Sequence, residues 1–131
     1  MAWITSVTNR TLADDWFLSL NRVENNTGYL ADTMATYNYP TTELVMITNW
    51  VRSDLFNFAQ DDSTRIIGNI NVIIGLLADT GIDMPSDLDY LTFENANNIE
   101  KTLDWLRGIV DNLDIILIRL SFRLGGDKFG S

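Results

Sequence analysis

The sequence of 131 residues contains neither cysteine nor histidine. Without cysteine there are no disulfides, no thiolate metal sites and no cysteine nucleophiles. Without histidine the chain lacks the commonest general base and the commonest transition-metal ligand, so its serines also lack their usual catalytic partner. We therefore expect a protein that is not an enzyme and that carries no cofactor and no metal.

Basic residues and long apolar runs are also scarce. The chain has nine basic residues against 18 acidic ones, which gives a formal net charge of −9. Nucleic acids and anionic membranes are bound through Lys and Arg, so this balance disfavours both partners. The longest apolar run, Ile70–Ala78, is interrupted by Asn71 and Gly75 and is far shorter than the ~20 residues of a membrane span. The opening residues have no signal-peptide pattern, so we expect a soluble chain.

Hydrophobic residues make up 46% of the chain, enough for one domain with a real core. Three stretches carry apolar residues at helical spacing, and the second is apolar on several sides, so we expect it to be central. The predicted fold is a single all-α domain, residues 1–131, with about three main helices. The three predicted stripes are Leu20, Val23, Thr27, Leu30 and Met34, then Ile66, Ile70, Ile73, Leu76 and Leu77, then Phe93, Ala96, Ile99, Leu103, Leu106 and Val110.

The chain repeats itself loosely, in units of about 14–38, 54–80 and 89–113. Each unit has an Asp, one or two large apolar residues, a capping residue and then a helix. Self-similarity with a period of roughly 35 to 40 residues is typical of one supersecondary unit used repeatedly. The equivalent positions are Arg22, Arg65 and Asn98, then Val23, Ile66 and Ile99, then Tyr29, Val72 and Trp105.

Capping residues predict where these helices begin and end. Ser19 and Thr92 are the expected N-caps of the first and third helices, and the second has Asp61, Asp62 or Ser63. Tyr39-Pro40 is expected to stop the first helix, and Gly81 suits a left-handed cap after the second.

Two segments allow alternative predictions. Residues 41–51 form either a short helix capped by Thr41 or Thr42, which we favour, or an extended segment. Residues 111–119 can continue the third helix, but the alternation from Ile116 to Leu124 resembles a short strand. A tail over residues 120–131 follows, broken by Gly125-Gly126 and either frayed or docked on a neighbour.

Asparagines are frequent in the predicted helices, where they are poor formers, at Asn25, Asn26, Asn69, Asn71, Asn97 and Asn98. They are either surface residues or amides that bond between repeats or subunits. Among the tryptophans, Trp16 and Trp105 are expected in the core. Trp3 either anchors on a neighbouring subunit or folds back on its own domain.

The acidic clusters fit helix capping and solvation better than catalysis. Asp14-Asp15 and Asp61-Asp62 are adjacent carboxylate pairs, and each precedes a predicted helix. Asp83, Asp87 and Asp89 are only a thin version of a calcium loop, without its glycine and final glutamate. We expect no catalytic pair and no metal site here.

The stretch Leu20–Asp32, LNRVENNTGYLAD, resembles a phrase found in small tail and tail-fibre proteins of phages and prophages of Gram-positive bacteria. Trp3–Asp14 and Asn49–Asn57 are similar to other parts of these proteins, as is the glycine-rich, aromatic end Gly125–Gly130. In the second unit Thr64 and Ile67 stand where the family has Asn and Glu. The resemblance implies a virion component near the tail tip or baseplate and supplies no catalytic residues.

The sequence hypothesis is therefore a virion structural protein, made in the host cytoplasm, that packs on other virion proteins and on copies of itself in a symmetric homo-oligomer. The alternative is an assembly chaperone or regulatory binding protein that does not stay in the virion. Docked termini are expected of the first, and mobile or intramolecularly buried termini of the second. The candidate interface residues are apolar ones near the ends and in the middle of the chain: Trp3, Ile4, Trp50, Phe122, Leu124 and Phe129.

Overall fold

The computed structural model describes residues 2–11, 16–51, 60–86, 88 and 91–115, with side chains from residue 20 in the first helix and 61 in the second. Three helices account for most of these residues: α1, Trp16–Ala35; α2, Gln60–Leu76; and α3, Phe93–Val110. A further helical turn covers residues 113–115, and the described part of the chain contains no strand. The prediction of an all-α fold with about three main helices is confirmed.

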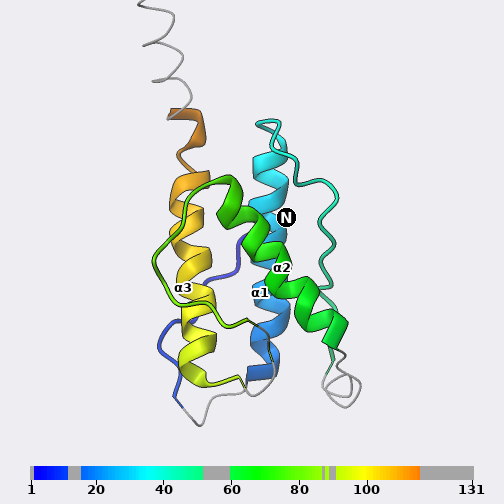
Figure 1. Cartoon of the computed structure of the whole chain (residues 1–131), viewed down its shortest axis with the longest axis vertical. Coiled ribbons are helices and arrows are strands. Elements are labelled where there is room, and N and C mark those ends of the chain that lie inside the picture. The colour runs from blue at the N-terminus through cyan, green and yellow to red at the C-terminus, as the bar shows by residue number, and fades with distance from the viewer. Residues whose placement is uncertain (1, 12–15, 52–59, 87, 89–90, 116–131) are drawn as a thin grey trace, which may run out of the picture.

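The first helix, not the second, is the central one. α1 packs against both α3 and α2. Figure 1 shows α1 and α3 side by side and running in the same direction, with α2 crossing in front of α1. The expectation that α2 is central was wrong. It rested on apolar residues on several sides of this helix, but one side faces solvent: Val72 is 42% exposed and Gly75 is exposed as well. Two grooves flank α1, and each holds an extended part of the chain.

The core is built from the predicted stripes. All five stripe residues of α1 are buried, as are Ile66, Ile70 and Ile73 of α2. Five of the six stripe residues of α3 are buried, and Phe93 at its start is half-buried. Helical spacing therefore identified the inward faces, because residues three and four apart share one face of a helix.

The end of α1 differs from the prediction. The helix stops at Ala35, before Tyr39-Pro40, in a Schellman arrangement whose left-handed residue is Asn38, with φ of 69°. The N–H of Tyr39 donates to the carbonyl of Met34 at 3.2 Å, and that of Asn38 donates to Ala35 at 3.0 Å. Asparagine tolerates this conformation better than other side chains, so it ends the helix in place of glycine.

One of the predicted boundary residues is confirmed. The Thr92 side chain accepts a hydrogen bond from the N–H of Asn95 and caps α3. Gly81 has the predicted left-handed conformation, with a φ of 73°, but it lies several residues past the end of α2 and does not cap that helix.

The predicted caps of the other two helices were misplaced. Ser19 lies inside α1, not before it. Asp61 and Asp62 lie in the first turn of α2, where they suit the helix dipole, but α2 already begins at Gln60. Ser63, also inside α2, accepts a hydrogen bond at 2.6 Å from the N–H of Leu88.

Residues 41–51 are extended after a turn at 42–43, so the favoured helix prediction was wrong. The physical reason is that side chains of α1 and α2 take the backbone hydrogen bonds that a helix would need for itself. The two segments that lie extended in the grooves are called segment 4–10 and segment 45–50.

Some predictions fall outside the described residues: the strand-like alternation from Ile116 to Leu124 and the tail over 120–131. The unit bounds 14–38, 54–80 and 89–113 remain predictions. Within the described residues, no helix is both long enough and apolar enough to cross a membrane.

Candidate functional site

Segment 45–50 is held between α1 and α2 by side chains that bond its backbone. Asn21 of α1 brackets Trp50: its Oδ1 accepts from the Trp50 N–H at 2.8 Å, and its Nδ2 donates to the Trp50 carbonyl at 2.9 Å. Asn69 of α2 donates to the carbonyl of Val45 at 2.7 Å. These side-chain amides make the hydrogen bonds that a neighbouring β-strand would otherwise make. Backbone N–H and carbonyl groups of the segment that are removed from water therefore still have hydrogen-bond partners.

Glu24 is the centre of this first groove. Its buried carboxylate accepts hydrogen bonds from the N–H of Ile47 at 2.9 Å and from the indole N–H of Trp50. Arg65 of α2 reaches the same carboxylate with two nitrogens, one of which also donates to Val45 at 2.9 Å. The hydrogen bond to Glu24 is the main cause that raises the pKa of the Arg65 guanidinium above its usual value.

Segment 4–10 is held between α1 and α3 in the same manner. Asn97 of α3 brackets Arg10, accepting from its N–H at 2.9 Å and donating to its carbonyl at 3.3 Å. Asn26 of α1 brackets Ile4, with distances of 2.9 and 2.8 Å. The chain end is thereby fixed to two helices at two points.

Glu100 is the centre of this second groove. It accepts from the N–H of Val7 at 3.2 Å and forms ion pairs with Arg10 and with Arg22 of α1. Arg22 reaches it with two nitrogens, at 2.6 and 2.9 Å. The side chains of Glu100 and Arg10 are 0% and 2% exposed, so this pair lies deeper than the one between Glu24 and Arg65, whose arginine is 19% exposed.

The two grooves share one spacing. Asn21 and Glu24 bind residues 50 and 47, and Asn97 and Glu100 bind residues 10 and 7. The bound stretches are also alike in sequence, Val7-Thr8-Asn9-Arg10 and Ile47-Thr48-Asn49-Trp50. Each glutamate also pairs with an arginine from another helix: Glu24 of α1 with Arg65 of α2, and Glu100 of α3 with Arg22 of α1. Arg22 and Arg65 occupy equivalent positions in the repeat units. Asn26, Asn69 and Asn97 are therefore buried amides that bond between parts of the chain, and surface exposure is the wrong interpretation for these three.

Trp3 folds back on its own chain. Its ring meets Tyr29 of α1 edge-to-face, with centroids 5.4 Å apart, and the guanidinium of Arg107 lies 4.8 Å from its centroid. Arg107 also pairs with Asp111 at 3.1 Å, and the Tyr29 hydroxyl donates to Asp111 at 2.9 Å. This aromatic and cation–π arrangement holds the start of segment 4–10 on α1 and α3.

A shallow groove lies beside this cluster, lined by Trp3, Thr5, Ser6, Asp104, Arg107, Gly108 and Asp111. Ser6 donates to Asp104 within it at 2.6 Å. The hydrogen bond to Asp111 is the main cause that raises the pKa of Tyr29; burial and the charge of Asp111 raise it further, and Arg107 opposes them. The charged side chains that line this groove all have a partner within the domain: Asp104 accepts from Ser6, and Arg107 and Asp111 form an ion pair. The groove therefore presents no unpaired charged group for catalysis.

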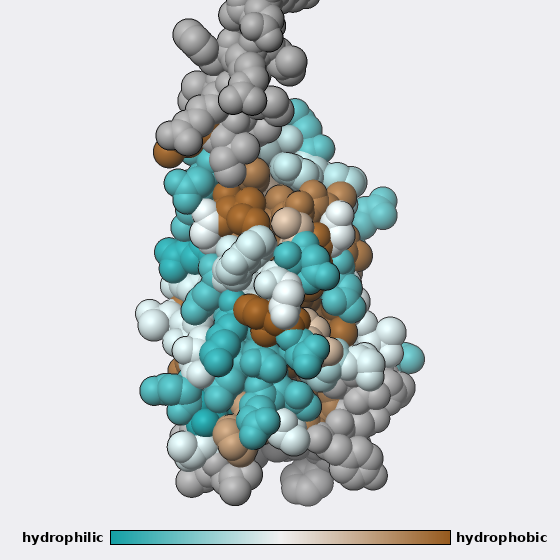
Figure 2. Space-filling model, turned by 60° about the vertical axis from the view of Figure 1, so that its left-hand side comes forward, coloured by the Kyte–Doolittle hydropathy of each residue, from teal (hydrophilic) through white to brown (hydrophobic). Residues whose placement is uncertain are grey.

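Apolar side chains that face solvent are the other surface feature. Trp105 is 42% exposed, so the expectation that it belongs to the core was wrong: it lies on the outer face of α3, off the stripe formed by Leu103 and Leu106. Among the described residues, the other large apolar side chains that are exposed are Ile4, Val45, Val51, Val72 and Ile115. Figure 2 shows apolar surface gathered toward the end of the molecule where α3 ends, and hydrophilic surface toward the opposite end.

The predicted interface residues fall in three situations. Ile4 is 45% exposed and open to contact. Trp3 and Trp50 are half-buried and engaged with Tyr29 and Glu24 of their own chain. Phe122, Leu124 and Phe129 lie outside the described residues. The glutamates and asparagines that organise the grooves were not singled out as a set, although the repeated Asn-x-x-Glu spacing in NRVE and NNIE was readable from the sequence.

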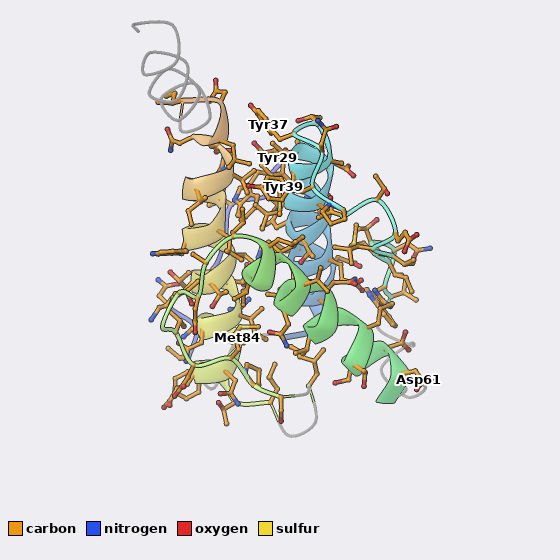
Figure 3. All side chains as sticks on the ribbon, turned by 45° about the horizontal axis from the view of Figure 1, so that its top comes forward. Tyr29, Tyr37, Tyr39, Asp61 and Met84 are labelled. Carbon is orange, nitrogen blue, oxygen red and sulfur yellow. The ribbon has the colours of Figure 1, made fainter. Side chains whose placement is uncertain are left out.

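The described residues include no group of three or more acidic side chains placed to hold a metal ion. Asp61 is exposed at the start of α2, at the far end from the tyrosines (Figure 3). Asp83 is exposed as well, and Asp14, Asp15, Asp87 and Asp89 lie outside the described residues. The two buried carboxylates, Glu24 and Glu100, are both neutralised by arginine.

Comparison with known proteins finds no matching family, no matching curated protein and no matching solved structure.

Proposed function

We propose that this chain is a virion structural protein of a tailed phage, an adaptor or decoration subunit of the tail tip or baseplate that acts by packing on other proteins. The resemblance of Leu20–Asp32 to phage tail proteins supports the proposal. Within that stretch, Asn21, Arg22 and Glu24 organise the two grooves. The phrase that resembles the phage family is thus the part of α1 that builds this fold.

The observation that carries the proposal is the use made of the buried charged side chains. Glu24 and Glu100 sit where a catalytic carboxylate would be sheltered from water, yet each is neutralised by arginine and bonded to backbone N–H groups. A general acid or base needs a site that substrate can reach and a proton that it can give or take. Here these groups fasten extended segments to helices, which suits a rigid part whose work is done by its surface.

The outward surface supports a packing role. Ile4, Val45 and Trp105 expose apolar side chains on an acidic body. Tryptophan is among the residue types enriched at the energetic hot spots of protein interfaces, so Trp105 is the strongest anchor candidate of the three. The acidic balance suits a partner with a basic face.

The test is mass spectrometry of purified virions from the source, with the copy number of this chain measured against the major tail protein. Stoichiometric presence is the expected result, and a copy number in multiples of three or six would place the chain at the tail axis. Absence from virions combined with abundance in infected cells would refute the proposal.

A second candidate function is an assembly chaperone that binds a partner and leaves. One observation favours it: Trp3 and segment 4–10 are bound on α1 and α3 of their own chain, which is the intramolecular burial expected of a chaperone. The virion measurement separates the two candidates.

A further inference from the structure

The outer face of α3 carries an exposed stripe of residues. Lys101, Trp105, Gly108 and Asn112 follow one another at intervals of four, three and four residues, so they lie on one side of the helix and of the turn that continues it. All four are exposed, whereas the buried Leu103 lies on the opposite side. Figure 1 shows α3 at an edge of the molecule, where such a face can meet another protein.

Trp105 projects from this stripe as a large apolar group. It is 42% exposed, whereas Trp3 and Trp50 are half-buried and engaged with side chains of their own chain. Tryptophan is enriched at the energetic hot spots of protein interfaces. A single exposed apolar residue is ordinary on a protein surface, so the surface next to Trp105 decides what this side chain can do.

The shallow groove begins one turn further along α3, at Gly108, and is lined by Trp3 and Ser6 as well. Its volume of about 470 Å³ is in the range of sites that hold a small ligand, so one indole ring fits. A side-chain carbon added at Gly108 would meet no atom within 4 Å beyond the backbone of its own helix, so the space over this residue is open. Glycine weakens a helix interior, but it lets another molecule approach the backbone closely. The stripe therefore carries a projecting side chain and, next to it, a hollow.

Charges of opposite sign lie at the two ends of the stripe. Lys101 is exposed at one end, and Asp111, which lines the groove and is also exposed, lies at the other. Asp111 already pairs with Arg107 at 3.1 Å, but a carboxylate accepts several donors and has room for an ammonium group as well. Two copies of a chain with a net charge of −9 repel each other overall, so a face that they share needs complementary charges of this kind.

These features are arranged symmetrically along α3. Trp105 and Gly108 lie at equal distances from a point midway between them, and Lys101 and Asn112 lie at equal distances from the same point. A two-fold axis through this point exchanges the projecting tryptophan with the groove, and the lysine with the neighbourhood of Asp111. Such self-complementarity is what an interface between two identical subunits requires.

We propose that two copies of this chain pack through the outer faces of their α3 helices, which run antiparallel. Trp105 of each copy fills the groove beside Gly108 of the other, and Lys101 of each copy pairs with Asp111 of the other. The inference deepens the proposed function and rests on its packing role. The two are tested separately: a chain that is present in virions but single in solution overturns this interface alone, and a chain that dimerises but is absent from virions overturns the proposed function alone.

The experiment measures the mass of the full chain by analytical ultracentrifugation over a range of concentrations. The wild type is expected to approach twice 14.9 kDa as the concentration rises. Gly108→Leu fills the groove with a side chain that its own domain accommodates, so this variant should stay at 14.9 kDa. Gly75→Leu is the matched control, because it makes the same substitution at an exposed glycine of α2 with equally open surroundings, and it should dimerise as the wild type does. Circular dichroism melting verifies that both variants remain folded, as expected because leucine favours a helix more than glycine does.

A second pair of variants removes apolar side chains of equal exposure. Trp105→Ala should raise the dissociation constant of the dimer about 30-fold or more, which is the effect of losing a hot-spot residue. Val72 of α2 is also 42% exposed, and Val72→Ala should leave the dissociation constant unchanged. Three results would overturn the proposal: a wild-type chain that keeps the mass of one copy, a Gly108→Leu chain that still dimerises, or equal effects of Trp105→Ala and Val72→Ala.

Introduced cysteines test the orientation, because the chain has none of its own. A mixture of Lys101→Cys and Asn112→Cys is expected to form disulfide-linked dimers under mild oxidation. Neither variant should cross-link with itself, because the two copies of one residue lie about 16 Å apart along antiparallel helices, and Cα atoms more than about 7 Å apart cannot be bridged. Cross-linking within each variant but not between the two would exclude the antiparallel arrangement.

Discussion

The groove between α1 and α3 and the groove between α1 and α2 hold their segments by the same set of contacts, but α2 has no such set of its own. Each groove uses an asparagine bracket, a buried glutamate three residues later and an arginine from a neighbouring helix. On α2 the equivalent positions carry Thr64 and Ile67, and the position on α3 equivalent to the groove arginines carries Asn98. The carboxylate and the guanidinium are therefore missing together.

The absence of both the glutamate on α2 and the arginine on α3 shows that each member of these ion pairs needs the other. A glutamate buried without a cation keeps a large desolvation cost, and an arginine without its carboxylate does the same, so the two are retained or lost as a pair. At α2 the corresponding side chain is Ile67, which is 3% exposed in the core, and the neighbouring contact is a hydroxyl, Ser63, that accepts from Leu88. Apolar packing replaces the ion pair there.

The largest effect is expected from forcing α2 to resemble the other two helices. Ile67→Glu places a carboxylate in the apolar core, and an uncompensated buried charge costs about 3–5 kcal/mol. We expect urea unfolding to show a loss of this size or a chain that does not fold. Thr64→Glu is the control: it is exposed on the same helix and near its N-terminus, where a carboxylate is favourable. Equal losses in both variants would contradict the proposed reason for the isoleucine.

The next largest effect is expected from removing the charge of either buried glutamate, and it should be larger in the groove whose ion pair is more deeply buried. Glu100→Gln removes the buried carboxylate that Arg10 and Arg22 share, and we expect a loss of about 3–5 kcal/mol in urea unfolding. Glu24→Gln leaves Arg65, which is more exposed, so a loss of about 1.5–3 kcal/mol is expected.

Glu94→Gln, at an exposed position of α3, is the control for both glutamates and should change stability by less than about 0.5 kcal/mol. If Glu24→Gln costs as much as Glu100→Gln, then depth is not what distinguishes the grooves.

A smaller effect comes from the asparagine brackets. Asn97→Thr reproduces the residue found on α2 and hardly changes helix propensity, so its effect reports the lost bracket. It removes the amide that bonds the N–H and the carbonyl of the buried Arg10, and we expect a loss of about 1–3 kcal/mol. Asn21→Thr acts on the half-buried Trp50, where water can substitute, and should cost about 1 kcal/mol.

Amide hydrogen exchange locates these losses along the chain. Asn97→Thr should speed exchange at Arg10, and Asn21→Thr should speed it at Trp50. Exchange that rises equally at both amides in each variant would mean that the segments are released together, and that the brackets do not act locally.

The sequence predicted the helices and their inward faces because those follow from local spacing. Leu30, Ile70 and Leu103 could be assigned to the core with no knowledge of the tertiary structure. Residues 41–51 could not be assigned correctly, since their extended form depends on Asn21 and Glu24, which lie more than twenty residues away in the chain.

The two grooves could not be predicted from the sequence either, because they too depend on contacts between residues far apart in the chain. Their partners include residues that are 93 positions apart, as Val7 and Glu100 are, and no local periodicity predicts such a pair. A signal did exist: the Asn-x-x-Glu spacing is present at 21–24 on α1 and 97–100 on α3, the two helices that carry the asparagine bracket and the buried glutamate. It is absent on α2, where Thr64 and Ile67 stand instead. Trp105 was misplaced because a tryptophan in a helix was taken as core, whereas its position is one residue before the buried Leu106 and off the stripe.

The smallest expected effect concerns Tyr29, which joins segment 4–10 to α1 and α3 through Trp3 and Asp111. Its pKa is raised above 10.0, chiefly because the neutral hydroxyl donates to Asp111. A raised pKa in the folded state means that the folded chain holds this proton more tightly than the unfolded chain. The stabilisation is therefore complete below pH 10 and is lost as the pH rises through the folded-state pKa.

Tyr29→Phe isolates this contribution, because subtracting the stability of the variant from that of the wild type removes the titration of the other tyrosines and lysines. We expect the difference to be constant from neutral pH to about pH 9 and to shrink above pH 10, when the phenolate loses its donor and repels Asp111. Asp111→Asn should remove most of the pH dependence while leaving the ring contact with Trp3 in place. A difference that grows with pH would mean that Arg107, which lowers this pKa, outweighs Asp111 in the cluster.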